Sequence, residues 1–351
     1  MKINFYYYKR PIPYVDGYLL KSKFYRCNYI RFKTLYNRPA LGTETVELYN
    51  FNPKSKVRAS VLILHGLGSR NIKFLLWMGT HLASAGVNST IVILPGNYTR
   101  VEHKSVSGRS YLWPEIKVMY RFWEHAVVDI LSTIDLLDQL NLWKKNNCVL
   151  GYCLGGMLAS IASSMDDRIN ETVFMATGGH IPKILYKSKA TRFARKLFED
   201  GLKTPYYLHD KERLYKTYNE QFPLVKQMSL KELISNEDIH PLFKIDPISY
   251  VHLLNKSKIT SINALFDETL PLTSRILLSK EMGEANKYLL PITHTGWLPF
   301  EYFLAKYILL KLNINDLKSK KLLLKKVKFE VPFLDYLFDI KPKGDKKETE
   351  S

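Results

Sequence analysis

The segment from Gly151 to Gly156, with the sequence Gly-Tyr-Cys-Leu-Gly-Gly, constrains the fold of this chain more than any other. It follows the apolar run 148–150 and precedes small residues at 157–163, the pattern of a buried strand that turns sharply into a helix. Glycines beside such a turn let strand and helix pass close together, while the turn points its central side chain, Cys153, into a site. The alternative is a glycine-rich turn around a buried structural cysteine.

Short apolar runs alternate with helical patterns along most of the chain. Runs bounded by turn residues predict buried strands at 60–64, 90–94, 148–150, 172–176, 259–266 and 287–292. Apolar residues at helical spacing predict helices at 74–85, 120–140, 272–282 and 301–312. This alternation indicates an α/β fold, with a mostly parallel sheet covered by helices on both faces. Reactive groups in such sheets gather at the carboxyl ends of the strands.

Interruptions of the alternation set the expected domain boundaries. The expected units are an N-terminal extension with edge strands at 1–58, a core at 59–179 and 259–312, a helical segment at 180–258 and a basic tail at 313–351. Within the extension, the clearest strand-like pieces are 29–32 and 45–48. The segment 180–258 is aromatic, basic and too long for a simple crossover. The end of the tail, 341–351, is polar and predicted to be disordered.

Three polar residues, Cys153, Asp267 and His294, each follow a predicted strand. A cysteine thiol is partly ionised near neutral pH and is intrinsically more nucleophilic than a hydroxyl. In the predicted chemistry Cys153 attacks an acyl carbon, His294 takes and delivers the proton, and Asp267 holds the imidazole. Glu268 is the rival for the acid, whereas the strand 172–176 ends in Thr-Gly-Gly and offers none.

Acyl chemistry also needs hydrogen-bond donors for a developing oxyanion. The backbone N–H of Leu154, directly after Cys153, is one predicted donor. The sequence His65-Gly66-Leu67-Gly68 follows the predicted strand 60–64, and the N–H of Leu67 is the candidate for the second. A plain turn is the alternative for this motif, and His65 is expected to support the loop rather than to react.

With these motifs, the chain resembles the α/β-hydrolase superfamily across roughly residues 45–312. The order nucleophile, acid, histidine is that of the superfamily. The elbow is similar to that of dienelactone hydrolases and to the cysteine lipase box of polyhydroxyalkanoate synthases. The sequences at 94–98, 107–110 and 126–129 are most similar overall to poorly characterised bacterial esterase-like members.

The resemblance implies an α/β-hydrolase fold in which the segment 180–258 forms a helical cap over the site. The chain departs from both better-known groups. It lacks an acidic motif of the synthase type after the strand 90–94, and it is much longer than a dienelactone hydrolase and carries the 180–258 segment.

The leading functional hypothesis is a hydrolase that cleaves a carboxylic ester or related acyl bond through an acyl-enzyme on Cys153. Its substrate is expected to be a small acyl or ester molecule. One alternative is an acyltransferase with chemistry of the polyhydroxyalkanoate-synthase type, because a thioester intermediate is well suited to passing acyl groups on. The other alternative is a non-catalytic interaction protein with the same fold. The intact Cys153, Asp267 and His294 argue against this alternative.

Composition narrows the partners and the compartment. The chain has three cysteines, which is no disulfide framework and points to a reducing compartment. Its first residues lack the apolar core of a signal peptide, and no run of about 18 apolar residues occurs, so we expect a cytoplasmic protein. His and Cys show no zinc spacing, and neither a metal nor an organic cofactor is implied.

The formal net charge of +19 allows an anionic partner such as nucleic acid or a lipid surface. No nucleic-acid-binding motif accompanies the charge. The lysines are spread along the chain, and frequent Lys, Ile and Asn also fit a proteome-wide bias. Contact with a membrane surface stays open as an alternative.

Overall fold

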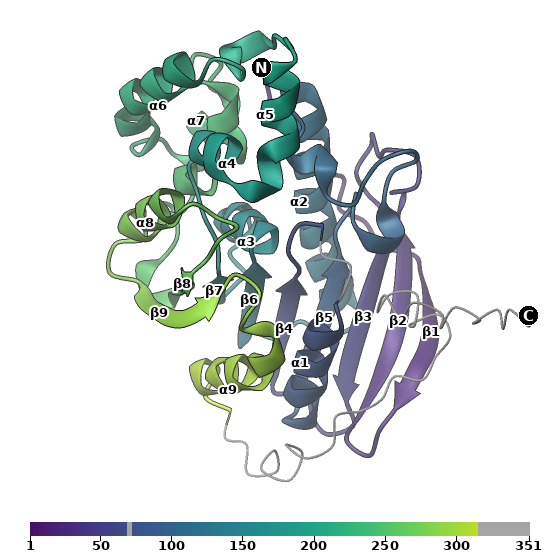
Figure 1. Ribbon diagram of the computed structural model, residues 1–351. Helices are drawn as coiled ribbons and strands as arrows, with labels where there is room; N and C mark the ends of the chain where they lie inside the picture. The colour runs from purple at the N-terminus through teal and green to yellow at the C-terminus, as the bar shows by residue number, and fades with distance from the viewer. Residues whose placement is uncertain (69–71, 315–351) are drawn as a thin grey trace, which may run out of the picture.

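A nine-stranded sheet, with the strand order β1-β2-β3-β5-β4-β6-β7-β8-β9, runs through the centre of the molecule (Figure 1). The structure is a computed structural model that describes residues 1–68 and 72–314. The strands are β1 (Tyr14–Lys21), β2 (Tyr25–Lys33), β3 (Thr45–Pro53), β4 (Ala59–Leu64), β5 (Val87–Ile93), β6 (Asn147–Tyr152), β7 (Glu171–Met175), β8 (Ile259–Phe266) and β9 (Asn286–Thr293). All pairs from β5 to β9 are parallel, which confirms the predicted sheet.

The central strands β4, β5 and β6 are buried along their whole length. Strands covered on both faces show continuous apolar runs, which is why these segments were visible in the sequence. In the register of β4 and β6, Leu64 pairs with Gly151. The carboxyl ends of the two strands therefore lie side by side, and the loops that follow them meet.

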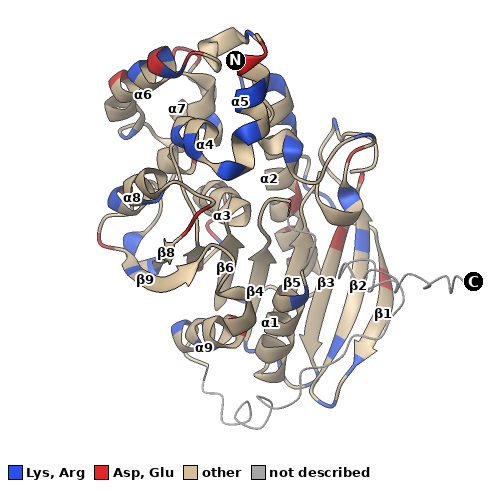
Figure 2. Cartoon of the chain, viewed as in Figure 1, with Lys and Arg blue, Asp and Glu red and all other residues tan. Residues whose placement is uncertain are grey.

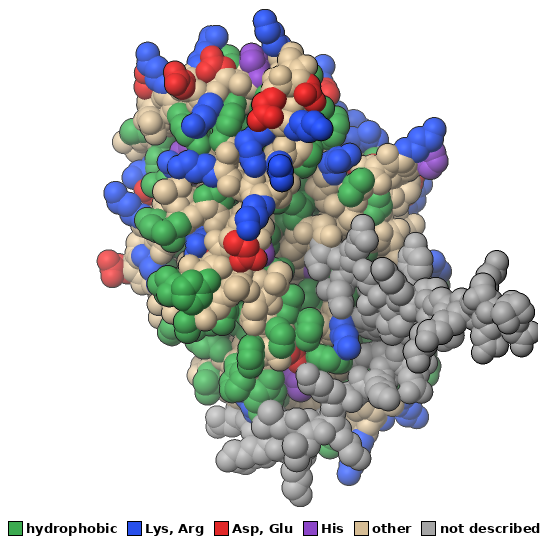
Figure 3. Space-filling model, viewed as in Figure 1, with side chains coloured by type: hydrophobic (Ala, Val, Ile, Leu, Met, Phe, Trp, Pro, Cys, Tyr) green, Lys and Arg blue, Asp and Glu red, His purple; other side chains and the backbone are tan. Residues whose placement is uncertain are grey.

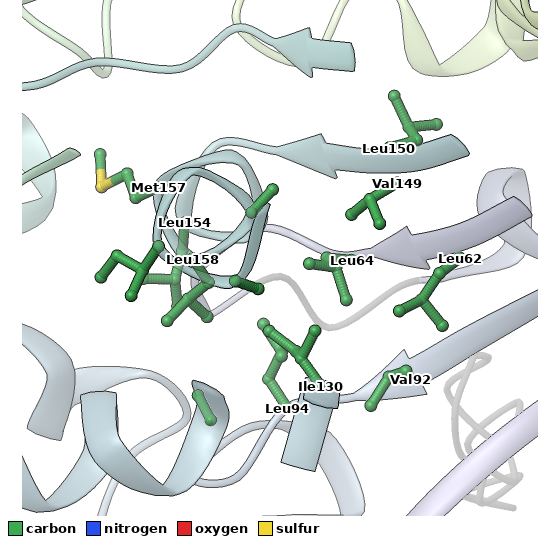
Figure 4. Close-up of a cluster of buried hydrophobic side chains, with 14 of the residues drawn as sticks. Leu62, Leu64, Val92, Leu94, Ile130, Val149, Leu150, Leu154, Met157 and Leu158 are labelled. Carbon is green, nitrogen blue, oxygen red and sulfur yellow. The ribbon is translucent and has the colours of Figure 1, made fainter. Parts of the chain in front are cut away.

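Helices α1 (Lys73–Ser84) and α9 (Glu301–Lys311) pack together over one face of the sheet, and α2 (Ile116–Gln139) and α3 (Leu154–Met165) over the other (Figure 1). Figure 4 shows Leu62, Leu64 and Val92 gathered with Ile130 and Leu158 between the sheet and its helices. These five side chains are fully buried. Burial of each side chain contributes about 1.5–3 kcal/mol to the free energy of folding. This apolar layer therefore fixes the position of α3 and of the turn before it.

The N-terminal part of the chain forms three antiparallel strands, and the first of them, β1, is absent from the sequence-based expectation. β1 is an edge strand with most side chains exposed, so its residues carry no alternating apolar pattern. The residues before β1 lie along α2. The N–H of Asn4 donates to Glu124, the hydroxyl of Tyr7 to Asp135 and the N–H of Ile12 to Gln139.

The segment between β7 and β8 contains helices and 3-10 turns and no strand. Its helices are α4 (Ile181–Lys187), α5 (Arg192–Glu199), α6 (Lys211–Val225) and α7 (Leu230–Ser235), which lie above the carboxyl ends of the strands (Figure 1). α8 (Leu272–Glu281) follows β8.

Asp246 connects the two ends of this helical segment. Its carboxylate accepts the N–H groups of His180 and Ile181 at 2.7 and 2.5 Å, and that of Ile248 at 3.1 Å. The side chain is fully buried, and this burial raises the pKa of Asp246 to about 6. The start of α4 is thereby attached to the chain just before β8.

No helix in the described ranges 1–68 and 72–314 is both long and apolar enough to cross a lipid bilayer. Most of the tail expected at 313–351, including its polar end, lies outside the described residues.

Candidate active site

Cys153 occupies a strained turn between β6 and α3. Its backbone angles, φ 52° and ψ −113°, are rare for a residue with a side chain. The surrounding structure holds this conformation: the N–H of Cys153 donates to the carbonyl of Met175 in β7 at 3.0 Å, and its carbonyl accepts the N–H groups of Gly156 and Met157 at 3.1 Å. The predicted strand–turn–helix unit is present, and its thiol stands at the carboxyl end of the sheet.

Two glycines make the close approach of α3 to the sheet feasible. A Cβ atom on Gly155 would lie 2.2 Å from the carbonyl oxygen of Leu64, at the end of β4. A Cβ atom on Gly156 would lie 1.9 Å from Oγ1 of Thr177, after β7. Any side chain at these positions would push α3, and Cys153 with it, away from the neighbouring strands.

Asp267 and His294 meet at the ends of β8 and β9. Nδ1 of His294 lies 2.7 Å from Oδ2 of Asp267. Burial raises the pKa of Asp267, but the hydrogen bond and charge of His294 and the backbone N–H groups of Leu270 and Thr269 outweigh it and lower the pKa overall. The carboxylate is therefore ionised and can only accept, so Nδ1 of His294 donates.

Backbone donors orient the Asp267 carboxylate. Its Oδ1 accepts the N–H groups of Thr269 and Leu270 at 2.9 and 2.8 Å, and Nε of Arg275 lies 3.8 Å from Oδ2. The Asp267 side chain is 0% exposed, whereas Glu268 is exposed to solvent. Of the two adjacent acids, Asp267 is the one that contacts the imidazole.

The other ring nitrogen of His294 faces the thiol. Burial lowers the pKa of His294, but the charge of Cys153, the hydrogen bonds to Asp267 and Cys153 and the charge of Asp267 together raise it to about 10. The raised pKa favours the imidazolium, which contacts the carboxylate of Asp267 through one ring nitrogen and Cys153 through the other. An imidazole in contact with a thiol can take its proton, which is what a cysteine nucleophile requires of its neighbouring base.

His65 supports the loop after β4, as predicted. Its Nε2 accepts the N–H of Leu94 at 3.0 Å, which leaves Nδ1 protonated to donate to the carbonyl of Gly66 at 2.8 Å. Complete burial lowers the pKa of His65 to about 4, so the ring is neutral. The residues Leu67 and Leu154, whose N–H groups were the predicted oxyanion donors, both line the cavity in front of Cys153.

That cavity has a volume of about 490 Å³, a size that holds a small molecule. Three groups of residues line it: those around Cys153 and His294, those of the loop 106–112, and those of the helical segment, namely Ile184, Ser188, Ala190 and Phe193. The helical segment therefore forms one wall of the cavity, where the sequence analysis placed a cap.

Tyr152 and Arg109 also line the cavity, and the sequence analysis gave neither of them a role. The hydroxyl of Tyr152 lies 3.3 Å from the carbonyl oxygen of His294, and the ring packs against the rings of His294 and Trp297. Tyr152 lies within the elbow motif, so its position beside Cys153 was the available signal. For Arg109 the signal was its place in a Ser- and Gly-rich loop.

The two other thiols lie away from this constellation. Cys27 is in β2 and Cys148 in β6, and both are fully buried. Burial raises the pKa of each thiol well above its ordinary value, which keeps both sulfurs protonated and unreactive. Among the described residues, no group of three or more His, Cys, Asp and Glu side chains is placed to hold a metal ion.

No protein-family model matches the chain, and no curated protein matches it in sequence. Among solved structures it is similar to acetyl xylan esterase 1 from Thermoanaerobacterium sp. JW/SL YS485, at 16% identity and a TM-score of 0.56, over 86% of this chain and 89% of that one. It is also similar to a cold-adapted esterase from an Arctic intertidal metagenomic library, at 12% identity and a TM-score of 0.51, over 86% of this chain and 97% of that one.

A third similar structure is the Pyrococcus horikoshii acylaminoacyl peptidase, at 14% identity and a TM-score of 0.52, over 90% of this chain and 44% of that one. Identities this low establish a common fold and nothing finer. All three neighbours have the α/β-hydrolase fold. The chain therefore has the α/β-hydrolase fold.

Proposed function

We propose that the protein hydrolyses carboxylic esters or related acyl bonds through a thioester formed on Cys153. The observation that carries this proposal is the placement of His294 between the Cys153 thiol and the buried Asp267 carboxylate. A surface histidine or a structural cysteine requires no such partners. The cavity in front of the thiol supplies room for a small acyl substrate.

In the first half-reaction the Cys153 thiolate attacks the acyl carbon, and the carbonyl oxygen becomes an oxyanion. The backbone N–H groups of Leu154 and Leu67 are the proposed donors to that oxygen. As the bond from carbon to the leaving group breaks, His294 gives its Nε2 proton to the departing oxygen. An alcohol leaves and the acyl group stays on sulfur as a thioester.

In the second half-reaction water attacks the thioester, and His294 now takes a proton from that water. The tetrahedral intermediate collapses, the Cys153 thiolate departs, and a carboxylic acid is released. The imidazolium and thiolate are thereby restored. Asp267 keeps Nδ1 of His294 protonated throughout, so that Nε2 is the nitrogen that exchanges protons with substrate and water.

The helical segment 180–258 is the proposed cap of this site. Ile184, Ala190 and Phe193 present apolar surface to the cavity, and the start of α4 is fixed through Asp246. A wall built from such residues limits the size and shape of the acyl group and excludes water from the reacting atoms.

An acyl adduct on Cys153 is the expected result when the protein is incubated with activated esters such as 4-nitrophenyl acetate and butyrate. Intact mass spectrometry should show one acyl group per chain, and peptide mapping should place it on Cys153. Cys27→Ala is the matched control, because its thiol is buried and its removal should leave the adduct in place. An adduct on another residue, or neither adduct nor turnover with any ester, would refute the proposal.

The same incubation separates hydrolysis from acyl transfer. Release of free carboxylic acid at the rate of ester consumption supports a hydrolase. Accumulation of a new ester or thioester with an added alcohol or thiol acceptor would instead identify an acyltransferase, the alternative that the cysteine nucleophile leaves open.

The pKa of His294 predicts the alkaline limit of turnover. The imidazolium must donate a proton to the leaving group, so activity is present below the pKa of about 10 and is lost as the pH rises through it. Asp267 contributes to raising this pKa, so Asp267→Asn should move the limit to lower pH.

Profiles of kcat/KM from about pH 7 to about pH 10.5 measure this limit, because kcat/KM reports ionisations of the free enzyme. Circular dichroism at each pH checks that the protein stays folded. Alkylation of Cys153 by iodoacetamide needs only the thiolate and should not decline over the same range. Identical alkaline limits in the wild type and Asp267→Asn would contradict the role given to His294.

A further inference from the structure

Arg109 is the permanently charged side chain in the described lining of the cavity. Among the described residues of the lining, Arg109 is the one Lys or Arg, and no Asp or Glu is present. Asp267 lies behind His294, where its charge is matched by the imidazolium, and Glu268 does not line the cavity. A substrate in front of Cys153 therefore meets one permanently charged side chain, that of Arg109.

The position of Arg109 is set by an aromatic contact between the core and the cap. Arg109 begins a 3-10 turn in the loop 106–112, and its guanidinium carbon lies 5.2 Å from the ring centre of Phe193 in α5. The Phe193 ring stacks on Trp113 with 6.0 Å between centres. Stacking uses the face of the guanidinium and none of its N–H groups, so these remain available to a ligand.

Several other arginines of the described chain donate to protein groups. Arg100 and Arg168 each form an ion pair with a carboxylate, and Arg195 donates to the carbonyls of Leu185 and Ser188. Arg109 is exposed, and within the described residues no carboxylate lies within ion-pair distance of its guanidinium. Arg109 thus combines a place in the cavity wall with a charge that the described carboxylates do not neutralise.

The part of the cap above Arg109 is also strongly basic. Residues 181–199 contain six basic residues, Lys183, Lys187, Lys189, Arg192, Arg195 and Lys196, and one acidic residue, Glu199. Figure 2 shows Lys and Arg along α4 and α5, and Figure 3 shows basic side chains gathered on the surface of this part of the molecule. A field of one sign around a cleft raises the local concentration and the association rate of ligands of the opposite sign.

We propose that the site selects small esters that carry an anionic group, a carboxylate or a phosphate, and that Arg109 binds this group. The planar guanidinium donates two parallel hydrogen bonds to such an oxyanion, which a lysine cannot reproduce. This assignment of substrate class rests on the proposed ester hydrolysis at Cys153. Arg109 is then the residue that determines specificity, and the basic face of α4 and α5 guides the substrate inward.

The test compares paired esters in which one member carries a carboxylate and the other carries a neutral group in its place. One pair is the 4-nitrophenyl monoester of adipic acid and the same ester with its free carboxylate methylated. A second pair, the acetyl esters of 4-hydroxybenzoate and 4-hydroxybenzamide, places the charge on the leaving group. In at least one of the two pairs, we expect wild-type kcat/KM to be at least about tenfold higher for the anionic ester than for the neutral one. An effect of this size is typical of a hydrogen bond to a charged group. The preference should shrink at high salt.

Arg109→Gln should lower this preference, measured as the ratio of the two kcat/KM values, by about tenfold, and Arg109→Lys should restore part of it. Arg213→Gln is the matched control: Arg213 is also exposed and stacked, 3.9 Å from the Tyr207 ring centre, but does not line the cavity. In Arg213→Gln, the ratio of kcat/KM for the anionic ester to that for the neutral ester should equal the wild-type ratio.

The outcomes separate the inference from the proposed function. If Arg109→Gln lowers both rates equally, Arg109 supports the loop and the inference is wrong. If the wild type acylates Cys153 with the neutral ester but shows no charge preference in either pair, the inference fails alone. If neither an acyl adduct nor turnover is seen with any of the four esters, the proposed function is overturned. If the protein releases fatty acids from phosphatidylglycerol vesicles but hydrolyses neither soluble pair of esters, the anionic substrate is a lipid. That result would overturn the assignment to small esters.

Discussion

Cys153→Ala and His294→Ala are each expected to lower kcat/KM by at least about 10³-fold, and the double variant should be little worse than either. Without the thiol there is no nucleophile, and without the imidazole the leaving group receives no proton. Both side chains serve the same step, so the loss of one removes most of what the other contributes. Steady-state kinetics with one activated ester measure all three variants.

Two controls address nonspecific effects of these substitutions. Cys27→Ala and His103→Ala remove one residue of each type outside the cavity, and both should keep kcat/KM within about threefold of the wild type. Near-full activity in Cys153→Ala or His294→Ala would show that the assignment of the triad is wrong. Additive losses in the double variant would mean that the two residues act in separate steps.

Gly155→Ala should destabilise the fold by more than about 3 kcal/mol. The new Cβ would lie 2.2 Å from the oxygen of Leu64 and 2.8 Å from that of His65. Both are backbone atoms, one at the end of β4 and one directly after it, so no rotamer change can relieve the contact. Gly17→Ala is the matched control, because its Cβ would meet only the Tyr29 carbonyl at 3.7 Å, and its effect should stay within about 1 kcal/mol.

Gly156→Ala should be comparably destabilising but repairable. The three nearest atoms to its Cβ all belong to the side chain of Thr177, the closest at 1.9 Å, so adding Thr177→Gly should recover most of the loss. No such rescue is available for Gly155→Ala. Urea unfolding of each variant measures the free energies. Equal stabilities of Gly155→Ala and Gly17→Ala, or no rescue by Thr177→Gly, would contradict the packing argument.

The features that the sequence predicted are those encoded by short segments. β6, the turn at Cys153 and α3 are contiguous, and glycines are the residues that such a turn requires. The positions of Asp267 and His294 followed from a topological rule, since each comes after a strand of a parallel sheet. The choice between Asp267 and Glu268 stayed open because both follow β8, and the direction of each side chain depends on backbone bonds to Thr269 and Leu270.

The features that the sequence did not reveal depend on contacts between distant segments. β1 has no apolar alternation because most of its side chains face solvent, so local pattern reasoning had no signal there. The stacking of Arg109 on Phe193 joins a 3-10 turn that precedes the elbow in the sequence to helix α5, which follows it. Neither residue is unusual in its own neighbourhood, and the significance of each comes from the other.

The order of the strands along the chain has a consequence during protein synthesis. Cys153 is made long before Asp267 and His294, and at about 5–20 residues per second a ribosome needs on the order of ten seconds to go from the first to the last. Until β8 and β9 join the sheet, Cys153 has neither the imidazole of His294 beside it nor the carboxylate that holds that imidazole. The proposed chemistry at Cys153 therefore begins only when the last two strands dock.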